Sequence, residues 1–402
     1  MPHSTRNIAR TLCLACALLI MLCAAAPAVA GARFRVGVSP ALGDAPVSGR
    51  LIISLLHVDS PLYRTNSAAN APFLSDPQPI FAADVRDLRP GMEILIADGT
   101  CDAFPGPPSA LPPGMYRVSA VLDTQQANSD WKREPGNLHS EEYTLHVGRD
   151  GAVTDLRIAL IRRTAEQPWP RIPGVEQFTV RSRLLSTFRG RDVTLRAGVV
   201  FPLDHDPTRQ YPAVYVIPGF GGDHRSALRE PRLRAGAPPG DLRRALWRRA
   251  FVIHLDPEGP NGHHLFANSQ NNGPMERALI EELIPVLQDK YNLLETPDAR
   301  VLSGKSSGGW SALWLLMRHP DVFGAAWSIA PDPLDFRAFQ RTDIYADRSM
   351  FGDEDNPTPS IVNRSGATLL TVRDEYRMEK VLGPGGTSAQ QWDSWQAVFG
   401  PR

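Results

Sequence analysis

The stretch that decides the fold is Val301–Pro331, which reads VLSGKSSGGWSALWLLMRHPDVFGAAWSIAP. Its first residues belong to a short apolar segment, Arg300–Ser303, that predicts a buried strand. Gly304-Lys305-Ser306-Ser307-Gly308 follows directly and fits the pattern Gly-x-Ser-x-Gly, and the apolar residues of Gly308–His319 then predict a helix. A serine at a sharp turn between a strand and a helix exposes its hydroxyl at the carboxyl edge of a sheet. The stretch therefore predicts an α/β fold with a reactive hydroxyl on Ser306.

Strands and helices alternate on both sides of this motif. Further strands are predicted at Ala213–Ile217, Ala250–Leu255 and Ala325–Ala330, and a helix at Met275–Tyr291, with a kink at Pro285. Two more strand-like runs, Phe178–Leu185 and Asp192–Phe201, flank Arg189-Gly190-Arg191 and predict a hairpin. A hairpin followed by strand–helix alternation predicts a mostly parallel sheet covered on both faces.

The first part of the chain follows a different pattern. Between Arg33 and Leu160, short alternating apolar runs are bounded by Pro, Gly and Asp, without a helical period. This pattern is typical of an antiparallel β-sandwich. Pro168, Pro170 and Pro173 then predict a stiff linker. We expect an all-β sandwich domain over residues 31–163, a linker over 164–177 and the α/β domain over 178–402.

The first thirty residues have the layout of a secretory signal. Arg6 and Arg10 precede the apolar run Thr11–Ala26, and Ala28-Val29-Ala30 supplies small residues before a cleavage site. The alternative, a membrane anchor, fits less well because sixteen apolar residues are few for a span. We expect cleavage after Ala30, no membrane anchor afterwards, and a periplasmic or secreted protein.

Charge and cysteine content narrow the function classes. The 402 residues contain 43 Lys and Arg against 43 Asp and Glu, so the chain lacks the net basic charge of a broad nucleic-acid-binding surface. Three of the four cysteines lie in the leader. Cys101 alone is left in the mature chain, where it can form no internal disulfide, and we interpret it as structural rather than catalytic.

A second glycine-rich segment supports the interpretation of Ser306 as a catalytic residue. The strand Ala213–Ile217 ends in Pro218-Gly219-Phe220-Gly221-Gly222-Asp223-His224. In an oxyanion hole, one amide of such a loop joins the amide that follows the nucleophile. These donors would be the N–H groups of Phe220 and Ser307. The structural alternatives are a simple glycine-rich turn and a helix start capped by a serine.

These residues resemble the putative-esterase group of α/β-hydrolases, which includes enterochelin esterases, esterase D (S-formylglutathione hydrolase), feruloyl and acetylxylan esterases and mycolyltransferases. The similarity covers about Phe178–Pro331 and is carried by Tyr211–His224, Glu276–Tyr291 and above all Val301–Pro331. It implies an α/β-hydrolase-type, mostly parallel sheet with Ser306 as nucleophile. An N-terminal β-sandwich also precedes the hydrolase in enterochelin-esterase-like proteins.

The resemblance implies an exported serine hydrolase that cleaves carboxylic esters through an acyl-enzyme on Ser306. Its substrate would be a small-molecule or glycan-linked ester, with no metal or organic cofactor and no nucleic acid. Two alternatives stay open. One is a non-catalytic secreted binding protein or inactive fragment on the same scaffold, and the other is an acyltransferase.

The sequence departs from the family pattern in one respect: no suitable histidine base follows Ser306. In this fold an Asp or Glu and then a His follow the nucleophile, but only His319 follows Ser306. Thirteen residues along a helix span about 20 Å, which excludes His319 as the base. We interpret the domain as incomplete at its C-terminus, without its last strand, closing helix and base. Asp374, after a strand at Ala367–Val372, is a weak candidate for the acid, and His263-His264 are expected in an exposed loop.

Overall fold

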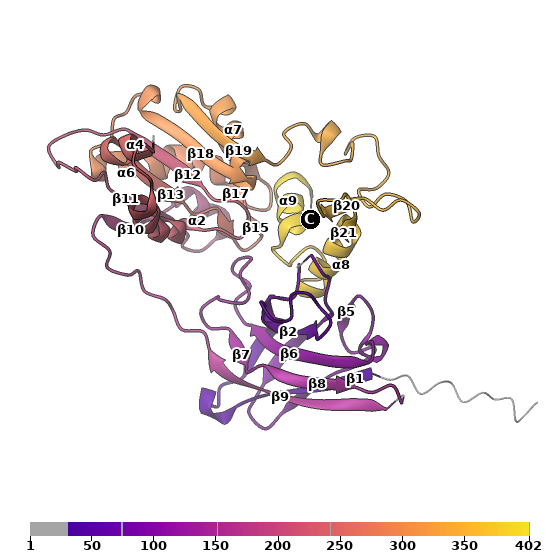
Figure 1. The fold of residues 1–402 in the computed structure, drawn as a ribbon. Helices are drawn as coiled ribbons and strands as arrows, with labels where there is room; N and C mark the ends of the chain where they lie inside the picture. Colours follow the sequence, from indigo (N-terminus) through magenta and orange to yellow (C-terminus); the bar gives the residue numbers. More distant parts are fainter. Residues whose placement is uncertain (1–30, 74, 151, 242, 402) are drawn as a thin grey trace, which may run out of the picture.

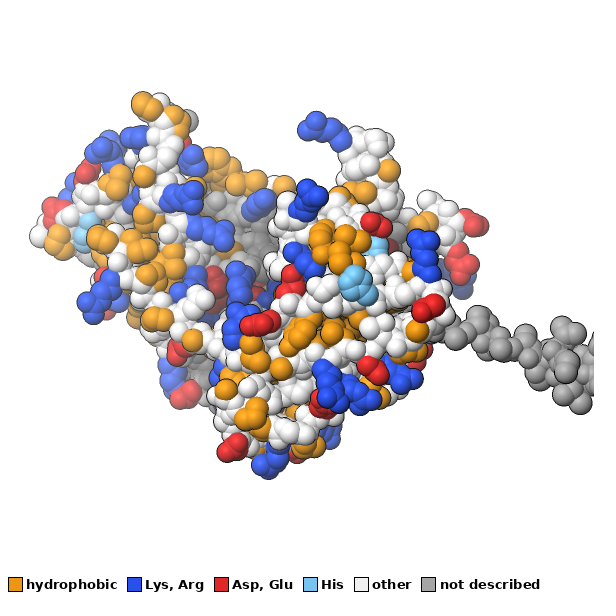
Figure 2. All heavy atoms as spheres, turned by 60° about the horizontal axis from the view of Figure 1, so that its bottom comes forward, with side chains coloured by type: hydrophobic (Ala, Val, Ile, Leu, Met, Phe, Trp, Pro, Cys, Tyr) orange, Lys and Arg blue, Asp and Glu red, His pale blue; other side chains and the backbone are white. Residues whose placement is uncertain are grey.

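The computed structural model describes residues 31–401 except 74, 151 and 242, so the predicted signal peptide lies outside the described residues. Two β-rich bodies follow one another along the chain, and a C-terminal segment lies against both of them (Figure 1). Basic and acidic side chains are interspersed on the face that Figure 2 shows, in keeping with equal numbers of the two. None of the described helices is both long and apolar enough to cross a membrane.

The N-terminal body is one curled sheet of nine strands. Its order is β4-β1-β9-β7-β6-β2-β3-β5, with β8 also paired to β6. The neighbours are antiparallel except β1 and β9, which are parallel. Apolar side chains on one face, such as Phe34, Leu51 and Phe81, form the core. The strands are β1 (Gly31–Val38), β2 (Val47–His57), β3 (Ile80–Leu88), β4 (Glu93–Ile96), β5 (Asp102–Phe104), β6 (Gly114–Asp123), β7 (Leu138–Ser140), β8 (Tyr143–Val147) and β9 (Val153–Arg163).

The second body is the expected α/β sheet. Its order is β10-β11-β13-β12-β18-β19, in which β13, β12, β18 and β19 are parallel and β10 and β11 are antiparallel. The carboxyl ends of the parallel strands therefore meet at one edge. The strands are β10 (Val175–Arg181), β11 (Thr194–Val200), β12 (Ala213–Ile217), β13 (Phe251–Leu255), β18 (Arg300–Ser306) and β19 (Ala325–Pro331).

The predicted hairpin is wrong in its connection. β10 and β11 do pair antiparallel, but residues 183–189 form helix α2 (Arg183–Arg189). The Ser182 hydroxyl accepts a hydrogen bond from the Leu185 amide and caps the start of α2, and Gly190 adopts a left-handed conformation at its end. These two capping residues specify a helix, which the strand-like run of apolar residues concealed.

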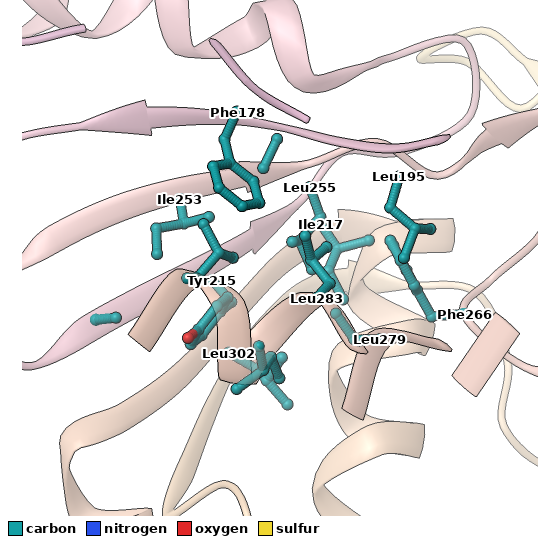
Figure 3. Close-up of a cluster of buried hydrophobic side chains, with 14 of the residues drawn as sticks. Phe178, Leu195, Tyr215, Ile217, Ile253, Leu255, Phe266, Leu279, Leu283 and Leu302 are labelled. Carbon is teal, nitrogen blue, oxygen red and sulfur yellow. The ribbon is translucent and has the colours of Figure 1, made fainter. Parts of the chain in front are cut away.

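Helices cover the sheet on both faces. On one face, Leu279 and Leu283 pack against strand residues such as Tyr215 and Leu302 (Figure 3). On the other face, Trp247 packs against Val252. The helices are α3 (Glu230–Gly236), α4 (Arg243–Arg249), α5 (Met275–Ala278), the π-helical η5 (Leu279–Leu283), α6 (Ile284–Tyr291) and α7 (Ser307–Arg318).

Close to Pro285, where the sequence predicts a kink, the structure has the π-helical segment η5, which directly precedes α6. Proline removes one hydrogen-bond donor from a helix, and a π turn accommodates that loss locally. The remaining short elements are η1 (Pro40–Leu42), η2 (Ala68–Asn70), η3 (Pro108–Ala110), η4 (His224–Arg229), η6 (Pro297–Ala299), η7 (Phe336–Ala338), β14 (Glu258–Gly259), β15 (Gly262–His263), β16 (Asn268–Ser269) and β17 (Gly273–Pro274).

The C-terminal segment is more ordered than its polar composition predicts. It forms the hairpin β20 (Pro359–Val362) and β21 (Thr368–Thr371), then helices α8 (Val372–Leu382) and α9 (Gln391–Phe399). The expectation of a single strand and no closing helix is wrong. Met378 and Leu382 of α8 pack on the outer face of the N-terminal sheet, and Trp395 of α9 packs on Trp310 of α7. The segment therefore connects the two bodies.

Candidate active site

Ser306 lies at a strained turn between β18 and α7. Its backbone angles are φ 54° and ψ −127°, a conformation that residues other than glycine rarely adopt. Ser306 occupies the N-cap position of α7, but its side chain makes no capping hydrogen bond. The structural alternative of a capping serine requires that bond, so the geometry does not support it. The hydroxyl is left available at the carboxyl edge of the parallel strands.

Glycine is required on both sides of this serine because backbones approach closely there. A Cβ atom on Gly304 would lie 2.1 Å from the Gly308 carbonyl oxygen. A Cβ atom on Gly308 would lie 2.0 Å from the carbonyl oxygen of Ile217, the last residue of β12. The start of α7 is therefore pressed against the end of β12, which explains the Gly-x-Ser-x-Gly pattern in physical terms.

The loop after β12 lies directly against the nucleophile turn. A Cβ atom on Gly219 would lie 3.3 Å from the Cβ of Ser306. The loop folds as a turn in which the Gly222 amide donates to the Gly219 carbonyl oxygen (3.0 Å), with Gly221 at φ +73°. Within the described part of the chain, neither the Phe220 amide nor the Ser307 amide has a hydrogen-bond acceptor. Ser307 is also the first residue of α7, where the helix dipole favours negative charge.

The side chain of His263 is hydrogen-bonded to this loop. Its Nε2 lies 2.9 Å from the Pro218 carbonyl oxygen, and its Nδ1 accepts a hydrogen bond from the Leu265 amide. Burial lowers the pKa of His263 to about 4, so the ring is neutral near pH 7 and Nε2 is the protonated nitrogen. The expectation that His263 and His264 are exposed is wrong, because both side chains are buried. Two adjacent histidines in a sequence do not indicate that one of them is buried and bonds to the Pro218 carbonyl oxygen.

Asp332 is the carboxylate at Ser306, and no pattern in the sequence singled it out. It follows the end of β19, with Oδ1 3.4 Å from Ser306 Oγ and Oδ2 2.6 Å from Ser307 Oγ. Burial raises the pKa of Asp332, and the two serine hydroxyls act in the opposite direction. The available signal was its position, because a side chain directly after a parallel strand adjacent to β18 must lie at the same sheet edge.

The two other candidates from the sequence lie elsewhere. His319 Nε2 is 3.0 Å from Glu276 Oε1, at the C-terminal end of α7, so this histidine is not at Ser306. Asp374 caps the start of α8, where its Oδ2 accepts a hydrogen bond from the Thr371 hydroxyl at 2.6 Å. The structure therefore brings together Ser306, Ser307 and Asp332, with the loop of Phe220 held against them at Gly219, and it places His319 and Asp374 outside this group.

A polar cavity of about 640 Å³ lies where the N-terminal body, the linker and the second body meet. Its wall includes Gly221 and Asp223 of the loop after β12, but none of Ser306, Ser307, Phe220 and Asp332. Burial raises the pKa of Glu134 and of Glu258 in this wall to about 7. Among residues 31–401 with their three gaps, no three His, Cys, Asp or Glu side chains are grouped so that they could hold a metal ion.

Asp256 forms the charged centre of this wall. Its Oδ2 lies 3.0 Å from His224 Nδ1 and 2.8 Å from Arg196 Nε. The His224 ring in turn stacks on Trp169 of the linker, with ring centroids 5.7 Å apart. The linker is thereby fixed against the second body on the cavity side of the loop.

Comparison with known proteins gives relatives at low identity. No curated protein sequence matches the chain. Solved structures similar to it include a ferulic acid esterase (17% identity, 42% of this chain and 66% of the other, TM-score 0.31). Others are an S-formylglutathione hydrolase from Agrobacterium tumefaciens (16%, 42% and 62%, TM-score 0.33) and a ferulic acid esterase from Anaeromyces mucronatus (17%, 58% and 91%, TM-score 0.31). The chain thus spans slightly less than two thirds of the length of the first two.

The family comparison covers the whole nucleophile region. The model of the family described as "Putative esterase" matches residues 190–398, slightly more than half of the chain. The matched range contains the loop after β12, the Gly304–Gly308 motif and Asp332. The fold is of the α/β-hydrolase type, as the sequence predicts, and the chain belongs to the putative esterase family.

Proposed function

We propose that the protein is a serine hydrolase that cleaves carboxylic esters through an acyl-enzyme on Ser306. The observation that carries the proposal is the Ser306 hydroxyl at a strained turn without a capping bond, next to the Ser307 amide and against the loop of Phe220, two amides that have no acceptor in the described part of the chain. Ser306 Oγ would attack the ester carbonyl carbon, the alcohol would leave, and water would release the acid. Membership of the putative esterase family supports this chemistry.

The amides of Phe220 and Ser307 would stabilise the charge that develops on the carbonyl oxygen. Each donor of this kind contributes about 3 kcal/mol to transition-state stabilisation. The close contact of Gly219 with the nucleophile turn supports this pairing, because it holds the loop against Ser306. Neither amide belongs to a flexible side chain, so little reorganisation accompanies the reaction.

A polar ester is the substrate class that this proposal favours. The cavity beside the loop is lined by charged and amide side chains, among them Arg196, Gln177 and Glu258, rather than by an apolar wall. The nucleophile does not line this cavity, so the wall would contact only the part of a small-molecule or glycan-linked ester that extends beyond the loop after β12. Export of the protein, with cleavage after Ala30, is part of the same proposal and rests on the N-terminal sequence. N-terminal sequencing of secreted or periplasmic material should find Gly31 first.

Labelling with a fluorophosphonate tests the catalytic proposal. We expect the probe to label the protein, a mass-spectrometric peptide map to place the adduct on Ser306, and Ser306→Ala to abolish labelling. Ser311→Ala, further along α7, is the matched control and should label normally, since its hydroxyl donates to the Ser307 carbonyl oxygen and, within the described part of the chain, forms no other hydrogen bond. A folded wild-type protein that stays unlabelled would favour the binding-protein alternative.

A further inference from the structure

Arginine is concentrated in one segment of a chain that is neutral overall. Residues 224–249 contain eight arginines and no lysine against two acidic residues, whereas the whole chain has 43 Lys and Arg against 43 Asp and Glu. The segment forms η4, α3 and α4, which follow the loop after β12. Its buried residues Ala227, Ala237 and Trp247 belong to one apolar cluster with Val252 of the sheet. The three elements therefore form one layer over that face of the sheet.

The outer side of this layer carries arginines without partners. Trp247 of α4 is buried, and the Arg234 guanidinium of α3 lies 5.8 Å from the centroid of its ring. Arg249 follows Trp247 by two residues, which is about 200° around a helix, so Arg249 points away from the sheet. Arg232 is related to Arg234 in the same way. Both side chains are exposed, and within the described part of the chain neither Arg232 nor Arg249 forms a hydrogen bond or an ion pair.

Acidic side chains beside this layer do not neutralise these two arginines. Three of them are each paired with another arginine, namely Glu230 with Arg234, Asp241 with Arg243 and Asp204 with Arg248. Arg225 and Arg244 donate to backbone carbonyl oxygens, which carry no full charge. The layer therefore has an excess of positive charge.

Exposed leucines lie among the arginines. Leu233 of α3 is 50% exposed and Leu246 of α4 is 36% exposed. Leu203 is 54% exposed, and its amide donates to the Trp247 carbonyl oxygen at 2.8 Å, which places Leu203 beside α4. A purely ionic partner would leave these leucines in water, whereas a lipid surface accommodates both the positive charges and the apolar side chains.

We propose that η4, α3 and α4 form a docking surface for a membrane that contains anionic phospholipid. A planar guanidinium group can donate two hydrogen bonds to one phosphate, and the leucines can enter the boundary between headgroups and acyl chains. The contact is peripheral, because α3 and α4 have seven residues each and are too short to span a bilayer. The inference goes beyond the proposed ester hydrolysis and needs no residue of the candidate active site.

Vesicle sedimentation of the full chain tests this proposal. The measured quantity is the affinity for vesicles of phosphatidylglycerol and phosphatidylcholine, divided by the affinity for vesicles of phosphatidylcholine alone. Any contact of the apolar run Thr11–Ala26 with lipid then enters both affinities. We expect the anionic vesicles to be preferred at low salt, and the preference to disappear at about 1 M salt, where the Debye length is about 3 Å.

The double variant Arg232→Gln/Arg249→Gln should lower this ratio up to about 25-fold at low salt, because each basic side chain at an anionic surface contributes about fivefold. Arg64→Gln/Arg86→Gln removes the same charge from two exposed arginines of the N-terminal body and is the matched control. A ratio that is unchanged in the first pair, or that falls equally in both pairs, would overturn the proposal.

Leucine variants separate lipid from other polyanions. Leu203→Ser/Leu233→Ser should weaken binding to the anionic vesicles about fivefold or more and leave binding to heparin unchanged. Met92→Ser changes a side chain of the N-terminal body that is 50% exposed and is the control. Vesicle binding that is unchanged in the leucine pair would also overturn the proposal, and heparin binding that depends on Arg232 and Arg249 would then assign the surface to an anionic polysaccharide.

These outcomes are distinguishable from a failure of the proposed function. Fluorophosphonate labelling of every variant should equal that of the wild type, because the substitutions lie outside the candidate active site. Thermal unfolding establishes that each variant is folded.

Discussion

The Nε2 atom of His263 lies 2.9 Å from the carbonyl oxygen of Pro218 and donates a hydrogen bond to it. This bond joins β15 to the loop whose Phe220 amide is the proposed oxyanion donor. Both ring nitrogens of His263 are engaged and the side chain is 1% exposed, so the bond is shielded from water. The position of the loop therefore depends on a residue whose ring nitrogens bond to Pro218 and Leu265 rather than to Ser306.

Replacement of His263 should loosen this loop. His263→Phe leaves a buried carbonyl oxygen without a donor, which should lower the free energy of unfolding by about 1–3 kcal/mol. It should also slow labelling of Ser306. His263→Gln can still present an N–H near the position of Nε2 and is the matched control, with a smaller effect on both quantities. Urea unfolding and the labelling rate measure the two effects, and identical results for both variants would contradict this role.

Glu258 should make the stability of the protein depend on pH. Its pKa is raised to about 7 by burial, above the ordinary value of 4.5. The folded protein therefore retains a proton between pH 4.5 and 7 that the unfolded chain has lost, and stability falls as pH rises through that window. Glu258→Gln carries no such charge, so its free energy of unfolding relative to wild type should increase by up to about 3 kcal/mol from pH 5 to pH 8.

Urea unfolding at the two pH values measures this difference. Glu258→Gln is a suitable mimic of the protonated Glu258 carboxyl group, because the Ser129 amide and hydroxyl can still donate to a side-chain oxygen at this position. Glu166→Gln removes an exposed carboxylate from the wall of the same cavity and serves as the control. A difference between Glu258→Gln and wild type that is the same at pH 5 and pH 8 would show that Glu258 does not titrate as expected.

Gly308 should tolerate no side chain. In Gly308→Ala the new Cβ would meet the Ile217 carbonyl oxygen at 2.0 Å and the Pro218 carbonyl oxygen at 2.5 Å, so the loop after β12 must move. We expect a loss of stability of at least about 1–3 kcal/mol and a large loss of labelling. Gly236→Ala is the control, because no heavy atom lies within 4 Å of its Cβ position and alanine suits a helix. Normal labelling of Gly308→Ala would contradict the close packing described here.

Cys101 should be an unreactive thiol. Burial raises its pKa from 9.0 to about 11, and the nearby Asp102 and Asp98 carboxylates act in the same direction. The reactive thiolate should therefore be about 100-fold rarer than for an ordinary cysteine at the same pH. Site-resolved alkylation of the Cys101 peptide by iodoacetamide at pH 8 should be correspondingly slow in the folded protein and fast in urea. Cys101→Ala should leave labelling of Ser306 unchanged.

Local sequence was sufficient for the elements that surround the nucleophile. β12 has the predicted bounds Ala213–Ile217, and the strand before Ser306 and the helix after it lie within a few residues of their predicted positions. The sequence pattern predicted the wrong element where the same apolar residues fit both a strand and a helix. The residues of α2 carry a strand-like pattern, and the cap at Ser182 decides for a helix.

The C-terminal segment shows a different limit. α8 is polar overall, but Met378, Val381 and Leu382 share one face and bury it on the N-terminal sheet. Arg50 of that sheet donates from Nε to the Val381 carbonyl oxygen at 3.2 Å. A short apolar stripe is stable only against a partner surface, and that surface belongs to residues between Ile52 and Trp131, far earlier in the chain.

The sequence by itself determined the family, most of the succession of strands and helices along the α/β domain, and the turn that exposes Ser306, because those features follow from local patterns and from glycines at fixed spacing. The tertiary structure decided which side chains meet there. Asp332 reaches Ser306 only because β19 lies parallel beside β18, and His263 reaches Pro218 only through the packing of β15 under the loop. Contacts between distant residues depend on how strands are ordered and stacked, which no local pattern of residues specifies.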